Sequence, residues 1–180
     1  APVTAASGYE AVLPVGKIKF DFYPIYDKSL SLTKTKEKKM GLDQFAHLRD
    51  QKPDWEKIYS DEHEPKKDGF VWRKHARLQQ FMAKKWAEQN PAENIEGSLS
   101  HLGFNGDQPA PCYLTEEVVK ELAEQIQKNF SDYHADDGFF WGQEYQEDSV
   151  KEYKEQDIKF LKFCEQAINE KKVVEYWCSW

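Results

Sequence analysis

The stretch that decides the fold is VVEYWCSW, residues 173–180, in which β-branched and aromatic residues predominate. This composition, with the alternation along it, is typical of a strand. Two earlier stretches alternate in the same way, KIKFDFY at residues 17–23 and LDQFAHL at residues 42–48. We therefore expect these three stretches to form a small, mostly antiparallel sheet in which the first and last strands can pair.

Three helices are predicted between the second and the third strand. The first rests on residues spaced three or four positions apart, namely Val71, His75, Leu78, Met82 and Trp86. The second begins after the capping residue Thr115, and the third begins at Ser149, which forms a capping box with Glu152. Strands and helices in this order predict an α+β fold with the three helices packed on one side of the sheet.

The length of 180 residues suits one domain with an appendage. Residues 40–180 contain the three helices and two of the strands, and we assign them to a single α+β domain. Residues 1–39 combine small residues, proline and glycine with the remaining strand, so we interpret them as an N-terminal arm with an added strand. Aromatic residues make up 14% of the chain, which favours a folded, aromatic-rich core.

The composition argues against several classes of protein. The net charge of −7 is unsuited to direct nucleic-acid binding, which needs a basic face. No apolar run approaches the roughly 20 residues of a membrane span, so we expect no membrane association. The three cysteines are Cys112, Cys164 and Cys178, and they fit no metal-ligand spacing. An odd number of such cysteines is typical of a reduced, cytosolic protein.

Five short motifs follow one another in a fixed order. They are MGLD at residues 40–43, VWRK at 71–74, CYLT at 112–115, GFFWG at 138–142 followed by Glu144-Tyr145, and YWCSW at 176–180. In this order they resemble a family of small, uncharacterised bacteriophage and prophage proteins whose members typically begin with Met-Gly-Leu-Asp. The resemblance covers residues 40–180. It implies a location in the host cytoplasm or in the virion, and it brings no established activity, catalytic residue or cofactor.

The cluster Trp72-Arg73-Lys74-His75 is the first candidate for chemistry. A partly buried histidine can act as a base, a ligand or a switch near neutral pH, and Arg73 and Lys74 can bind an anion near a helix N-terminus. The catalytic candidates are His75, Asp137 and Glu144, and the binding candidates in this cluster are Trp72, Arg73 and Lys74. The alternative is that His75 is a core residue with satisfied hydrogen bonds and that the two cations are solvated.

Metal and thiol chemistry have weaker support. No histidine pair has ligand spacing on one predicted helix, so we expect no metal or other cofactor. A site assembled from distant elements would use His75, His134, Asp136 and Asp137. Asp43 either joins such a site or accepts backbone hydrogen bonds at a strand end. Cys112 lies just before a helix N-terminus, where a thiol pKa can be lowered, whereas Cys164 is expected to be inert in the core.

Residues 131–157 carry nine acidic side chains and two lysines, a local charge of −7 that equals the net charge of the whole chain. The binding candidates on this stretch are Glu147, Asp148, Glu152 and Glu155. Such a surface suits a basic protein partner, or it imitates the phosphates of DNA. The alternative is a solvated helix face, with the aromatic residues of 138–142 in the core.

We therefore expect a phage-type accessory protein that binds a macromolecular partner, host or phage, through an acidic face and without catalysis. One alternative is a virion component anchored by residues 1–39 through strand addition. Another is a small hydrolase-like enzyme with a pocket around His75. The sequence does not indicate an oligomeric state.

Overall fold

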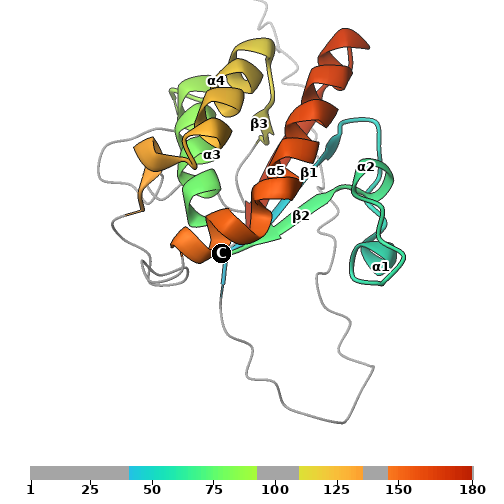
Figure 1. Ribbon diagram of the computed structural model, residues 1–180. Helices are drawn as coiled ribbons and strands as arrows, with labels where there is room; N and C mark the ends of the chain where they lie inside the picture. Colours follow the sequence, from blue (N-terminus) through green and yellow to red (C-terminus); the bar gives the residue numbers. More distant parts are fainter. Residues whose placement is uncertain (1–40, 93–109, 136–145, 180) are drawn as a thin grey trace, which may run out of the picture. The chain divides into compact units, whose positions relative to one another are not determined.

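The computed structural model describes residues 41–92, 110–135 and 146–179 (Figure 1). These residues form an α+β fold, as predicted, with a four-stranded sheet whose order is β2-β1-β4-β3. The strands are β1 (Asp43–Leu48), β2 (Phe70–Arg73), β3 (Cys112–Tyr113) and β4 (Val174–Ser179). Each of the three strand pairings is antiparallel.

The two central strands confirm the predicted strands at residues 42–48 and 173–180. Strands β1 and β4 pair along their whole length, from Asp43 opposite Ser179 to Leu48 opposite Val174. Burial alternates strictly along β4, so every second side chain faces the helices. The strand predicted at residues 17–23, with its pairing to the last strand, lies outside the described residues. The partners of β4 are β1 and β3.

Three long helices cover one side of the sheet: α3 (Ala76–Gln89), α4 (Glu116–Gln127) and α5 (Gln146–Asn169). Figure 1 shows α4 and α5 side by side, and these two helices pack against each other. The predicted cap of α4 is present, because Thr115 Oγ1 accepts a hydrogen bond from the backbone N–H of Val118 over 3.4 Å. The charged connection between β1 and β2 contains two one-turn helices, α1 (Trp55–Ile58) and α2 (Pro65–Asp68).

The start of the first helix was predicted wrongly. Residues 70–73 form β2, which pairs with β1 through Val71 opposite Phe45, and α3 begins only at Ala76. Aromatic and β-branched side chains favour a strand here, and pairing with β1 supplies hydrogen bonds that a helix would otherwise supply. Lys74 then turns the chain toward α3 with a left-handed φ of 58°.

The prediction of a capping box at the start of the third helix is also wrong. Helix α5 already includes Gln146, so Ser149 lies inside it. The hydroxyl of Ser149 donates instead to the carbonyl oxygen of Lys74, at 3.0 Å. The Ser149 hydroxyl therefore makes a tertiary contact, whereas the sequence pattern predicted that it caps the helix. The GFFWG run at 138–142 lies outside the described residues.

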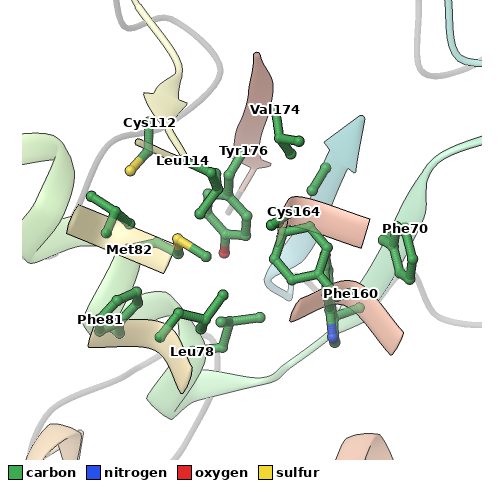
Figure 2. Packing of buried hydrophobic residues seen from close by; sticks show 14 of the residues in the cluster. Phe70, Leu78, Phe81, Met82, Cys112, Leu114, Phe160, Cys164, Val174 and Tyr176 are labelled. Atoms are coloured by element: carbon green, nitrogen blue, oxygen red, sulfur yellow. The ribbon is translucent and has the colours of Figure 1, made fainter. Parts of the chain in front are cut away.

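Aromatic side chains dominate the core between the sheet and the helices. Figure 2 shows Tyr176 of β4 among side chains of α3 and α5, including Leu78, Met82 and Phe160. Phe160 also contacts Phe70 and Trp72 of β2, with ring centroids 5.1 and 4.9 Å apart. The same core also contains buried polar side chains, and these make up most of the candidate site.

Candidate functional site

His75 occupies the N-cap position of α3 and is fully buried. Its ring nitrogen Nδ1 accepts a hydrogen bond from the backbone N–H of Leu78 at 3.4 Å. The hydrogen of the neutral ring is therefore on Nε2, which lies 2.9 Å from Asp157 Oδ2 and donates to it. Both ring nitrogens are thus engaged, one in capping α3 and the other in binding α5.

Asp157 is the buried carboxylate that receives this hydrogen bond. Only 2% of the residue is exposed. Its second oxygen, Oδ1, accepts a hydrogen bond from the indole Nε1 of Trp72 at 2.8 Å. Two donors from the β2–α3 segment therefore compensate for much of the water that this carboxylate loses on burial.

A chain of hydrogen bonds continues from His75 across the sheet. The side chain of Gln44 accepts from the backbone N–H of His75 at 2.9 Å and donates to its carbonyl at 3.1 Å. Gln44 Nε2 also donates to the Tyr176 hydroxyl at 2.8 Å, and that hydroxyl donates to Gln79 Oε1 at 2.6 Å. Gln79 in turn donates to Cys178 Sγ. This buried network satisfies each polar group through a specific neighbour and so favours one packing arrangement of the core.

Helix α5 makes further hydrogen bonds to the same segment. Gln156 donates to the carbonyl of Val71 at 2.7 Å, and the Tyr153 hydroxyl contacts both the backbone N–H and the carbonyl of Arg73. With the bonds of Ser149 and Asp157 described above, α5 contacts every residue from 71 to 75. These side chains also cover the outer edge of β2, which is an edge strand of the sheet.

The structure does not support the predicted catalytic role of His75. Its side chain has no exposed surface, and its partner is Asp157, whereas the predicted partners Asp137 and Glu144 lie outside the described residues. Asp157 was not among the predicted site residues. The available signal was its position among the apolar residues that form the inner face of the third helix.

The structure does not support the prediction that Trp72 is a binding residue. It is fully buried, stacks on Phe70 and is therefore part of the core. Arg73 is exposed, with its Nε 3.8 Å from Asp43 Oδ1. Partial burial raises the pKa of the Asp43 carboxyl, although the charges of Arg73 and Lys74 oppose this shift. The predicted anion site therefore retains two cations, one of which already has a carboxylate neighbour.

All three cysteines are buried and none of them forms a disulfide. Cys112 lies in β3, and burial raises the pKa of its thiol, in contrast to the lowered pKa expected near a helix N-terminus. Burial also raises the pKa of Cys164 well above its ordinary value and that of Cys178 to about 12. Because the thiolate is the nucleophile, these cysteines are unsuited to covalent catalysis.

Within the described ranges, no group of three or more histidine, cysteine or acidic side chains could hold a metal ion. Of the four residues considered for such a site, Asp136 and Asp137 lie outside those ranges. His75 is already fully hydrogen-bonded, and His134 is exposed, so these two do not form a site together.

The predicted acidic residues all lie on the first part of α5 and are exposed: Glu147, Asp148, Glu152 and Glu155. Glu147 forms an ion pair with Arg77 of α3. The other three make no ion pair with any described residue. At 100° per residue they share one side of the helix, and we call Asp148, Glu152 and Glu155 the α5 acidic face.

Comparisons with known proteins give no relative. No family model, no curated protein and no solved structure matches the chain. The resemblance to phage and prophage proteins therefore stays a prediction. Among the described residues, no helix is both long and apolar enough to span a membrane.

Proposed function

We propose that this protein is a non-catalytic accessory protein that binds a basic protein partner through the α5 acidic face. The observation that carries the proposal is the spacing of its three carboxylates. Asp148 and Glu152 are four residues apart, and Glu152 and Glu155 are three apart, so like charges are neighbours on the helix surface. Such pairs destabilise a helix by about 0.2–0.5 kcal/mol each. Lys151 and Lys159 lie three or four residues from Asp148 or Glu155 and offset part of this cost there, but Glu152 has no lysine at either spacing. Binding of a basic partner explains the cost that remains at Glu152.

The helix dipole explains only part of this arrangement. Acidic residues in the first turn, Glu147 and Asp148, stabilise the positive N-terminus of a helix. Glu152 and Glu155 lie beyond the first turn, where this effect is small. Their shared position on the surface therefore supports a role outside the fold.

The inner side of α5 makes this face a rigid platform. Tyr153, Gln156 and Asp157 are hydrogen-bonded to the β2–α3 segment, between and beside the acidic positions. A partner with lysine or arginine side chains would meet carboxylates whose backbone is already ordered, so little conformational entropy is lost on binding. Attraction between exposed charges also speeds association and weakens at high salt.

The two alternative functions have less support. Residues 1–39 lie outside the described part of the chain, so anchorage in a virion through this arm stays a prediction. An enzyme with its pocket at His75 is disfavoured because that side chain is buried and both its ring nitrogens are hydrogen-bonded.

The test is a pull-down with the immobilised full chain at low and high salt, followed by affinity measurement with the purified partner. We expect the double variant E152K/E155K to lose a stoichiometric, salt-sensitive partner. The matched control is E124K/E165K, which reverses two charges at exposed positions on α4 and on the later part of α5. Equal binding by wild type and E152K/E155K would contradict the proposal, as would equal loss in both variants.

A further inference from the structure

A pocket of about 420 Å³ lies between α3, the end of α4 and the short 3₁₀ helix η2 (Ser131–Tyr133). Six residues line it: Gln80 and Lys84 of α3, Gln125 of α4, Asp132 and Tyr133 of η2, and His134. This volume is within the range of small-molecule sites. The pocket is separate from the α5 acidic face and from the buried network of His75.

The core holds the walls of this pocket in place. Gln125 is only 8% exposed, and its Nε2 donates to Asp132 Oδ2 at 2.8 Å, which ties α4 to η2. The Tyr133 ring packs edge-on against Phe81 of α3, with centroids 5.3 Å apart. Polar side chains are thus presented from a scaffold that a ligand does not need to order.

The wall made by Gln125 and Asp132 has an excess of acceptors. The hydrogen bond from Gln125 and the charge of Lys128, whose Nζ lies 3.5 Å from the same Oδ2, lower the pKa of Asp132, so this carboxylate is ionised at neutral pH. Its Oδ1 receives no hydrogen bond from any described residue. The amide oxygen of Gln125 is buried and receives no hydrogen bond from the described part of the chain. This wall therefore suits a positively charged group that donates hydrogen bonds.

The remaining lining residues have an excess of donors. The ammonium group of Lys84 lies 5.7 Å from the centre of the Tyr133 ring and makes no ion pair with a described residue. His134 is exposed and makes no hydrogen bond in the described part of the chain, so its ring can donate an N–H. These two side chains suit a carboxylate. One ionised carboxyl and one ammonium in the same pocket disfavour a multiply charged anion, since it would meet Asp132.

We propose that this pocket binds a free α-amino acid, whose ammonium group contacts Asp132 and whose carboxylate contacts Lys84. The zwitterion matches both charges, and the volume leaves room for an amino-acid side chain beside Tyr133. The site would let a small metabolite bind the protein independently of its macromolecular partner.

The test is an NMR titration of the ¹⁵N-labelled full chain with each of the standard L-α-amino acids, with acetate and methylammonium as probes of one charge each. We expect at least one amino acid to give saturable shifts at the amides of Gln125, Asp132 and His134. It should bind about tenfold or more tightly than either single-charge probe. Lys84→Met and Asp132→Asn should each weaken it by a similar factor. The exposed Lys162→Met on α5 is the matched control.

Three outcomes would overturn the proposal. One is the absence of saturable shifts for every amino acid up to about 10 mM. This concentration is about tenfold above a dissociation constant of about 1 mM, so even a weak specific site would be largely occupied. Another is acetate binding as tightly as the amino acids, which would show simple attraction of a carboxylate to lysine. The third is unchanged binding in both pocket variants. E152K/E155K should retain amino-acid binding, so this proposal and the partner-binding proposal can fail separately.

Discussion

The imidazole of His75 and the carboxylate of Asp157 are joined by a 2.9 Å hydrogen bond in the core, although 82 positions separate them in the chain. This bond connects the N-cap of α3 to the middle of α5. Because Trp72 also donates to Asp157, one buried carboxylate holds β2, α3 and α5 together. His75 was predicted from the sequence as a catalytic candidate, but in the structure it joins three elements of the fold together with Trp72 and Asp157. We call these three residues the structural junction.

Removal of this carboxylate should be among the most damaging single changes. Asp157→Ala leaves the Trp72 and His75 donors buried without an acceptor, and we expect a loss of about 3–5 kcal/mol in the free energy of unfolding. Asp157→Asn keeps one acceptor oxygen and should lose less. Urea denaturation followed by tryptophan fluorescence measures both. A loss below about 1 kcal/mol for Asp157→Ala would show that the junction is not needed.

The capping role of His75 can be separated from its bond to α5. Asparagine is a good N-cap residue, whereas alanine cannot accept the hydrogen bond from the Leu78 N–H. We expect His75→Asn to be about 1 kcal/mol more stable than His75→Ala, with both less stable than wild type. Denaturant midpoints of the two variants provide the comparison. Equal midpoints would mean that the 3.4 Å bond to Leu78 contributes nothing.

Lys74 has a left-handed backbone, with φ of 58°. This conformation costs a non-glycine residue about 1–2 kcal/mol, a cost that glycine does not have. Glycine in turn lowers the free energy of unfolding by about 0.5–1 kcal/mol, because its backbone loses more conformational entropy on folding. Lys74→Gly should therefore stabilise the protein by about 0.5–1 kcal/mol in thermal or urea unfolding. The same substitution at Lys162, inside α5, should destabilise it by about 1 kcal/mol. Destabilisation at both positions would contradict the role assigned to the turn.

Reversal of charge on the α5 acidic face should affect binding and stability in opposite directions. Glu152→Lys removes repulsion with Asp148 and Glu155, so we expect the free energy of unfolding to rise by a few tenths of a kcal/mol at low salt. The gain should diminish at high salt because exposed charges are screened. Urea unfolding at both salt concentrations tests this. A loss of stability would mean that the carboxylates serve the fold.

The buried thiols should make the protein sensitive to alkali. The folded pKa of Cys178 is about 12, above its ordinary value of 9.0, because burial disfavours the thiolate. A pKa raised by folding favours the native state below the unfolded pKa, and this contribution is lost as pH rises from about 9 to about 12. Unfolding midpoints should fall over this range. At pH 8 the native thiols should react with a thiol reagent far more slowly than in urea, and equal rates would contradict their burial.

Local patterns in the sequence were sufficient for part of the fold. Alternating residues identified β1 and β4, and Thr115 marked the start of a helix that the structure confirms. The helix prediction was wrong for residues 71–75 because the four-residue spacing of Val71 and His75 also fits a strand followed by a turn. Pairing with β1 decided between the two, and that pairing depends on residues nearly 30 positions away.

The sequence by itself determined the α+β class, the central strands, the long helices and the acidic character of α5, because these follow from short-range periodicity, capping and composition. Only the tertiary structure decided that His75 is paired with Asp157, that Trp72 is core, and that Ser149 binds Lys74. Buried polar groups take their partners from whichever elements pack beside them. That choice is made by the packing of distant segments, which local spacing does not encode.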